Sequence, residues 1–221
     1  MSDPKIIICG TGRAGTTLLV ALLSDLGLDT GFHPGMRING KAGGLETDVE
    51  RRAETPRIIK SPGLSTRLGR LLEEGAIEVE HVIVPVRDLE IAAASRVRVA
   101  GYGRFLGVRG GFTGTRSASH QRAVLDSMLA ELVWTLTRFD LPHTLLEFPR
   151  FAHDWQYTYD KLGFLAPECN AADFQRVIEA RYDPTEIREE PLTSRERFES
   201  ALLQPWTIAR RAVKRVRRPP S

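Results

Sequence analysis

Cysteines and long apolar runs are both scarce in this sequence of 221 residues. It contains two cysteines, Cys9 and Cys169, which are too few for a disulfide framework, and no Cys/His cluster has the spacing of zinc ligands. The longest apolar runs, at 6–9 and 18–23, are far shorter than the ~20 residues of a membrane-spanning helix. We therefore expect no disulfide-rich domain, no metal site and no transmembrane segment.

A secretory leader is also not evident. Strand-like sequence begins a few residues after Met1, without a basic segment or a small-residue cleavage site before it. We expect a cytoplasmic protein. Hydrophobic residues make up 42% of the chain and charged residues 27%, which is ordinary for a globular protein and excludes a wholly disordered, collagen-like or coiled-coil chain.

Lysine is rare, and the net charge of +3 comes from one end of the chain. The segment 207–221 holds six basic residues and no acidic ones, so 1–206 has 25 basic against 28 acidic residues. We interpret 1–206 as a single domain, helical from about residue 153, and 207–221 as a basic tail. We expect no nucleic-acid-binding body. The tail either contacts an anionic membrane surface or a nucleic acid, or is a disordered, solubilising end.

Hydrophobic periodicity predicts an alternation of strands and helices. The predicted strands are Lys5–Cys9, Arg57–Lys60, Val79–Arg87 and Thr144–Phe148. The predicted helices are Thr16–Leu26, Leu64–Glu74, Asp88–Val97, Ser117–Arg138, Asp154–Leu162, Ala171–Tyr182 and one opened by a capping box at Thr193–Glu196. A glycine-rich loop is expected at Gly101–Gly114. This order predicts an α/β fold, with three α/β/α layers around a parallel sheet and a helical C-terminal part, and places ligands at the carboxyl ends of the strands.

The first predicted strand is followed by the sequence GTGRAGTT, at Gly10–Thr17. Its spacing is that of a P-loop, G-x-x-x-x-G-K-[ST], with Thr16 in the place of the lysine. Backbone N–H groups at a helix N-terminus still favour an anion there. Because the cation is Arg13, at the mouth of the loop, a short diphosphate-like group fits better than ATP with magnesium. The alternative is an unrelated glycine-rich turn.

Within this loop, RAGTTL at Arg13–Leu18 resembles the 5′-phosphosulfate loop of the sulfotransferases that use 3′-phosphoadenosine 5′-phosphosulfate (PAPS). The family's second signature is an apolar strand that ends in arginine, with a serine eight residues later, and Val82–Arg87 with Ser95 is similar to it. The resemblance implies that Arg87 and Ser95 bind the 3′-phosphate of PAPS. It implies that the 5′-phosphosulfate is bound by Gly12, Arg13, Ala14, Gly15, Thr16 and Thr17.

A third element, IIKSP at Ile58–Pro62, is similar to the K-x-P that follows the family's second strand. The resemblance implies that Lys60 neutralises charge on the leaving phosphate. Taken alone, Lys60 is a lysine before a turn, and Arg87 with Asp88 is a surface ion pair and helix cap. Two features depart from the family: Leu18 replaces an aromatic residue of many cytosolic members, and no R-K-G-x-x-G stretch lies near the carboxyl terminus.

Sulfuryl transfer also needs a base that takes the proton of the acceptor. His33 follows the first helix, where some bacterial members of the family have an acidic residue, and Glu46 lies in a glycine-rich loop. We rank these two equally, ahead of His120 at the start of the long helix. The arginines between 91 and 125, with no acid among them, indicate an anionic glycan, lipid or small-molecule acceptor, or simply a solvated loop. The chemistry requires no metal.

Two other functions are compatible with the same residues. A P-loop nucleotide kinase or NTPase with a displaced cation would bind ATP with magnesium, which Thr16 disfavours. A non-catalytic nucleotide-binding or interaction protein of the same fold would keep the loop and bind a partner through its arginines and tail. The leading hypothesis is a PAPS-dependent sulfotransferase that acts by in-line displacement.

Overall fold

The computed structural model describes residues 3–38, 44–47, 55–105, 117–185, 187 and 190–202. They divide into two compact units. The first unit consists of the described residues up to Arg87 and from Ser127 to Ile187. The second consists of those from Asp88 to Asp126 and from 190 onward. The basic tail predicted at 207–221 lies outside the described residues.

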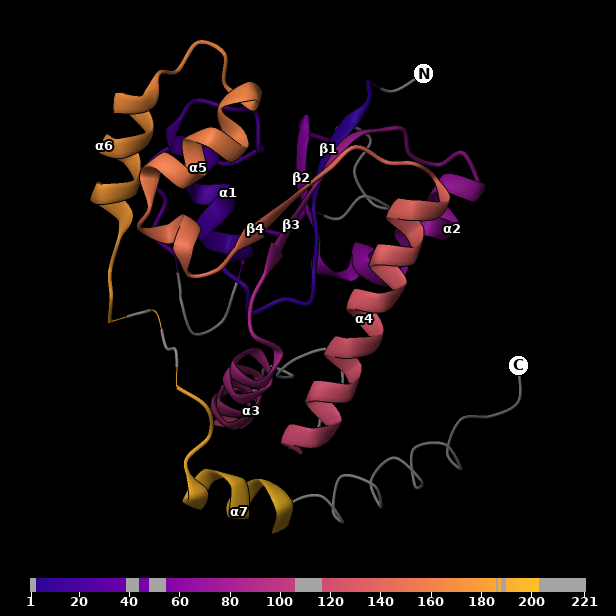
Figure 1. Cartoon of the computed structure of the whole chain (residues 1–221), viewed down its shortest axis with the longest axis vertical. Helices are drawn as coiled ribbons and strands as arrows, with labels where there is room; N and C mark the ends of the chain where they lie inside the picture. The colour runs from indigo at the N-terminus through magenta and orange to yellow at the C-terminus, as the bar shows by residue number, and fades with distance from the viewer. Residues whose placement is uncertain are drawn as a thin grey trace. The chain divides into compact units, whose positions relative to one another are not determined.

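A four-stranded parallel sheet forms the centre of the first unit (Figure 1). Its order is β2-β1-β3-β4. The strands are β1 (Lys5–Ile8), β2 (Ile58–Lys60), β3 (Val79–Val86) and β4 (His143–Glu147). Ile8 pairs with Lys60 on one side and with Ile83 on the other. Since Ile8 and Lys60 are both last in their strands, β1 and β2 end level with each other.

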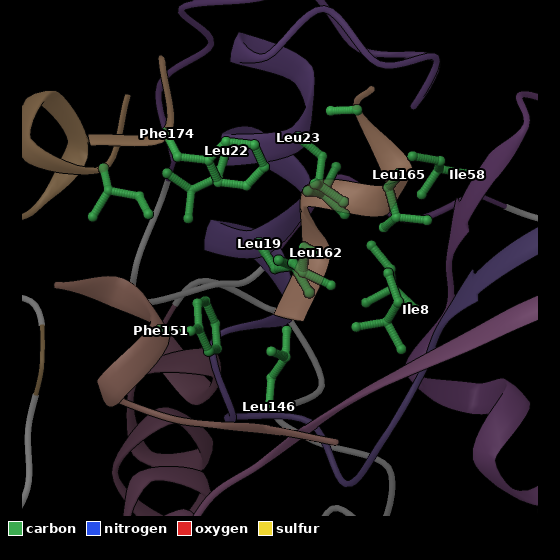
Figure 2. Packing of buried hydrophobic residues seen from close by; sticks show 14 of the residues in the cluster. Ile8, Leu19, Leu22, Leu23, Ile58, Leu146, Phe151, Leu162, Leu165 and Phe174 are labelled. Atoms are coloured by element: carbon green, nitrogen blue, oxygen red, sulfur yellow. The ribbon is translucent and has the colours of Figure 1, made fainter. Parts of the chain in front are cut away.

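Alternation along β1 gives the sheet two buried faces, because successive side chains of a strand point to opposite sides. Ile6 and Ile8 pack into one cluster, whereas Ile7 and Cys9 pack into the other. The first cluster is covered by α1 (Thr16–Asp25), α5 (Trp155–Leu162) and α6 (Ala171–Arg181). Figure 2 shows Leu19 of α1 beside Leu162 of α5 in this cluster.

The second face is covered by helices from two other parts of the chain. They are the 3-10 helix Pro62–Thr66, α2 (Leu68–Glu73) and the carboxyl-terminal part of α4 (Ala118–Arg138). Leu132 and Leu136 of α4 pack against Leu64, Leu68 and the strands. The first unit therefore has three layers, and the predicted α/β/α fold with a parallel sheet is confirmed.

The first helix ends just before a glycine. Gly27 has φ +83, and its N–H donates to the carbonyl of Ser24 while the N–H of Leu28 donates to that of Leu23, both at 3.0 Å. This pair of bonds is a Schellman motif, which satisfies carbonyls that the last turn of a helix leaves without partners. A left-handed residue is needed at this position, and glycine adopts that conformation without strain.

The second unit contains α3 (Leu89–Phe105), whose extent corrects one prediction. Asp88 caps the helix, because its Oδ1 accepts the N–H of Ile91 at 2.9 Å. The helix then continues past Val97 through the first glycines of the predicted loop. Glycine lowers helix propensity by about 1 kcal/mol relative to alanine, but it keeps its backbone N–H and so does not end a helix as proline does. Residues 106–114 of the predicted loop lie outside the described residues.

The capping box predicted at Thr193–Glu196 is present at the start of α7 (Ser194–Leu202). The N–H of Glu196 donates to Thr193 Oγ1 at 3.2 Å, and the N–H of Thr193 donates to Glu196 Oε2 at 2.8 Å. Arg98 of α3 donates to both oxygens of the same carboxylate, at 2.9 and 3.1 Å. These hydrogen bonds lower the pKa of Glu196 to about 2, the bond from Arg98 contributing most.

Two absences apply to the described part of the chain. No helix in it is both long enough and apolar enough to cross a membrane. The same residues contain no group of three or more His, Cys, Asp or Glu side chains arranged to hold a metal ion.

The Arg98–Glu196 pair predicts how the stability of the second unit depends on pH. Because the pKa of Glu196 is lower in the folded chain than the ordinary 4.5, its contribution is complete above pH 4.5 and is lost as the pH falls toward 2. We expect the Glu196 carboxyl to titrate near pH 2 in an NMR experiment, and its titration to move up toward 4.5 in Arg98→Ala. A wild-type midpoint near 4.5 would contradict the pairing.

Candidate functional site

The loop between β1 and α1 lies at the carboxyl end of the sheet and has an unusual backbone. Gly12, Arg13 and Gly15 have φ values of +71, +59 and +75. Gly15 precedes α1 and provides no side-chain cap. The first N–H groups of a helix have no acceptors inside it, and the helix dipole adds positive potential there. The loop therefore presents backbone donors at a position that favours an anion.

Residues that follow β2 and β4 also contact this loop, through a hydrogen bond and through packing. Ser65, after β2, is 2% exposed, and its hydroxyl donates to the carbonyl of Gly10 at 3.0 Å. Phe148, after β4, and Phe151 fill the space beside Gly15. A Cβ on Gly15 would lie 2.6 Å from Phe148 Cε2 and 2.8 Å from Phe151 Cζ, so only glycine fits.

Arg87 supports the loop from the end of β3. It is 7% exposed, and its Nη1 donates to the carbonyl of Arg13 at 3.0 Å. The guanidinium carbon lies 5.0 Å from the centroid of the Phe148 ring, within the range of a cation–π contact. The arginine that the sequence places at a strand end is therefore in contact with the loop between β1 and α1, 74 residues earlier in the chain.

Lys60 brings an ammonium group to the start of α1. The side chain is 2% exposed, and its Nζ donates to Thr17 Oγ1 at 3.0 Å and to the carbonyl of Gly44. Glu46 Oε1 lies 3.7 Å from the same Nζ. Because β1 and β2 end level, the lysine at the end of β2 reaches the hydroxyl of Thr17, one residue after Thr16, which stands at the lysine position of the P-loop pattern.

The electrostatics of Lys60 follow from this position. Burial lowers the pKa of its ammonium below the ordinary value, the negative charge of Glu46 opposes the shift, and the positive charge of Arg13 adds to it. The carboxylate of Glu46 is 59% exposed, in contrast to the buried amine. The site thus combines a buried cation with a carboxylate that solvent or a second molecule can reach.

The structure brings several of the predicted site residues together, but it places His33 elsewhere. Arg13, Thr17, Lys60, Glu46 and Arg87 interact directly or through the loop, as described above. Gly12, Ala14, Gly15 and Thr16 form the loop and the first residue of α1. Ser95 and His120 belong to the second unit, where Ser95 is buried in α3 and His120 lies in the first turn of α4.

His33 is not brought to the loop. It lies in an exposed turn beside the opposite end of α1, because the N–H of Gly35 donates to Asp25 Oδ1 at 2.7 Å. Asp25 is the last residue of α1. At 1.5 Å per residue it lies about 14 Å along the helix from Thr16. Of the two equally ranked bases, the structure therefore places only Glu46 at Lys60.

The arginines of the predicted arginine-rich segment do not form an open basic surface where the structure describes their side chains. Arg98 is paired with Glu196, and Arg122 is paired with Asp126 at 3.0 Å and with Glu90 at 3.1 Å. Arg96 is buried at 4% exposure. The described arginines are therefore engaged by carboxylates or buried, and they give an anionic acceptor less support than the sequence predicts. Arg109 and Arg116 lie outside them.

Sequence reasoning missed the residues that support the loop. Ser65, Phe148 and the carbonyl of Gly44 have no signature of their own, because each acts through a contact with a distant part of the chain. One signal was present for Phe148: it is the last residue of a predicted strand, at the edge of the sheet where ligands are expected.

Comparison with known proteins adds little to this geometry. No protein-family model matches the sequence, and no curated protein is similar to it. Among solved structures, the chain is similar to the sulfotransferase domain from the curacin biosynthetic pathway, with 14% sequence identity and a TM-score of 0.42. The match covers 92% of this chain and 99% of that domain. A similarity at this TM-score carries no argument about function, so the function has to be inferred from the site.

The packing at Gly15 predicts a large loss of stability on substitution. We expect Gly15→Ala to lower the free energy of unfolding by ~1–3 kcal/mol through overpacking against Phe148, in addition to the ~1 kcal/mol for a left-handed alanine. Gly27→Ala is the matched control, because Gly27 also has a positive φ but a Cβ there would contact nothing within 4 Å. Equal losses in urea denaturation would show that the loop does not pack on Phe148.

Proposed function

We propose that the loop and Lys60 bind the phosphosulfate of PAPS, and that the chain is a sulfotransferase. The observation that carries the proposal is the position of Lys60, whose ammonium lies at the N-terminus of α1 while the loop has no lysine of its own. A helix N-terminus with a buried cation beside it suits a doubly charged group. The resemblance of RAGTTL at Arg13–Leu18 to the family's loop supports the same donor.

In the proposed reaction, an oxygen or nitrogen of the acceptor attacks the sulfur of PAPS. A new bond forms to sulfur, the bond between sulfur and the phosphate oxygen breaks, and adenosine 3′,5′-bisphosphate leaves. Catalysis of this type depends mainly on alignment and on neutralising charge. The loop N–H groups hold the 5′-phosphate, Lys60 neutralises the charge that develops on the leaving oxygen, and Arg87 with Ser95 holds the 3′-phosphate.

Glu46 is the base in this proposal. Its carboxylate is largely exposed and lies 3.7 Å from the ammonium of Lys60. An acceptor that approaches the sulfur from the solvent side meets this carboxylate, which takes the proton of the attacking group. The acceptor is a hydroxyl or an amine of a small molecule, glycan or lipid.

Binding without magnesium separates this function from a nucleotide kinase or NTPase. We expect calorimetry to detect adenosine 3′,5′-bisphosphate in the presence of EDTA, with an affinity that magnesium does not raise. Lys60→Met should weaken binding about 10- to 100-fold, since a hydrogen bond to a charged group contributes ~1.5–3 kcal/mol. Lys5→Met is the control, because Lys5 is also buried but lies at the opposite end of β1, bonded to the carbonyl of Thr55.

Two results would contradict this proposal in different ways. Affinity for ATP that requires magnesium would favour the kinase or NTPase. No affinity for either nucleotide would favour the non-catalytic interaction protein.

Substitution of the two candidate bases tests the role of Glu46. We expect Glu46→Gln to lower kcat for sulfuryl transfer by 100-fold or more, within the range of general base catalysis. The same variant should bind adenosine 3′,5′-bisphosphate at least as tightly as wild type, because a negative charge beside Lys60 has been removed. His33→Asn should leave kcat unchanged. The opposite pattern would assign the base to His33.

A further inference from the structure

The loop before α1 holds a conformation that its own sequence does not favour at every position. Gly12 and Gly15 adopt a positive φ without cost, but Arg13 has φ +59 as well. For a residue with a side chain, the left-handed region costs about 1–2 kcal/mol. Such a residue persists only where its surroundings hold it in place. Arg13 therefore needs neighbouring groups that hold its backbone in this conformation.

The side chain of Arg87 makes one such contact. Its Nη1 donates to the carbonyl of Arg13 at 3.0 Å, and the side chain is almost entirely buried. Hydrogen bonds with a charged donor are stronger than neutral ones, and burial removes competition from water. The bond therefore fixes the orientation of the peptide that follows Arg13, whose N–H belongs to Ala14.

The same guanidinium is connected to the loop at a second point. It lies 5.0 Å from the centroid of the Phe148 ring, and this ring occupies the space where Gly15 would carry a side chain. Arg87 and Phe148 thus form one buried support that contacts the loop on both sides of Ala14. The ends of β3 and β4 carry this support, so the loop takes its shape from the sheet.

We infer that Arg87 is a positioning residue for the 5′-phosphate loop, in addition to the contact with the 3′-phosphate that the proposed function gives it. The inference rests on the proposed use of the loop as the 5′-phosphate site. A residue that only binds the 3′-phosphate affects ligands that carry one, whereas a residue that shapes the loop also affects ligands that bind through the 5′-phosphate alone.

Two nucleotides that differ only in the 3′-phosphate test this inference. The affinities of adenosine 3′,5′-bisphosphate and adenosine 5′-monophosphate are measured by calorimetry for wild type, Arg87→Ala and Ser95→Ala. We expect Arg87→Ala to weaken both nucleotides about 10-fold or more. Ser95→Ala is the matched control, because the proposed function gives Ser95 a contact with the 3′-phosphate only. It should weaken the bisphosphate and leave the monophosphate unchanged.

Arg87→Lys is a second variant, which is used in case Arg87→Ala does not fold. It keeps the charge but cannot hold the Arg13 carbonyl with the same planar fork. We expect a folded protein whose amide signals at Gly12–Thr17 shift in NMR spectra and whose affinity for the monophosphate is lowered. Unchanged amide signals together with unchanged monophosphate affinity would overturn the inference, even if the bisphosphate is bound more weakly.

Failure of the proposed function gives a different pattern. If wild type binds neither nucleotide, inorganic pyrophosphate is the probe for the loop alone. Weaker binding of pyrophosphate to Arg87→Lys than to wild type would support the positioning role without the nucleotide. Equal binding, or no binding to wild type, would overturn the positioning role as well.

Discussion

The backbone conformation of the loop between β1 and α1 is the constraint on which the rest of the site depends. Four of its residues have a positive φ, namely Gly10, Gly12, Arg13 and Gly15, and one of them is an arginine. The loop is held by contacts from residues that follow the three other strands, namely Ser65 after β2, Arg87 after β3 and Phe148 after β4. Because these contacts come from the carboxyl ends of parallel strands, the loop conformation depends on the formation of the sheet.

Lys60, at the end of the neighbouring strand, brings a buried ammonium group to the first residues of α1. Burying an ammonium group is costly unless acceptors surround it. Here the hydroxyl of Thr17, the carbonyl of Gly44 and the carboxylate of Glu46 serve as those acceptors, and burial still lowers the pKa of the amine. The same arrangement that stabilises the cation places a carboxylate beside the N-terminus of α1. The buried amine of Lys60 and the exposed carboxylate of Glu46 are thus neighbours that stabilise each other electrostatically.

Local patterns predicted the elements well where the signal was local. The apolar run of each strand and the capping box of α7 depend on residues within a few positions of each other. The end of α3 was predicted too early, because glycine lowers helix propensity without preventing the helix from continuing. Among the site residues, the motifs indicated the loop, Lys60 and Arg87, but they ranked His33 and Glu46 equally, since both lie in irregular segments whose path no periodicity defines.

The sequence by itself determined that glycines and threonines follow a buried strand, that a lysine and an arginine end two others, and that such strand ends meet at one edge of a parallel sheet. Only the tertiary structure decided that Glu46 and not His33 lies beside Lys60, and that Arg87 bonds to the loop carbonyl of Arg13. The physical reason is distance along the chain. Contacts between residues tens of positions apart depend on how the layers pack, and no short pattern of residues encodes them.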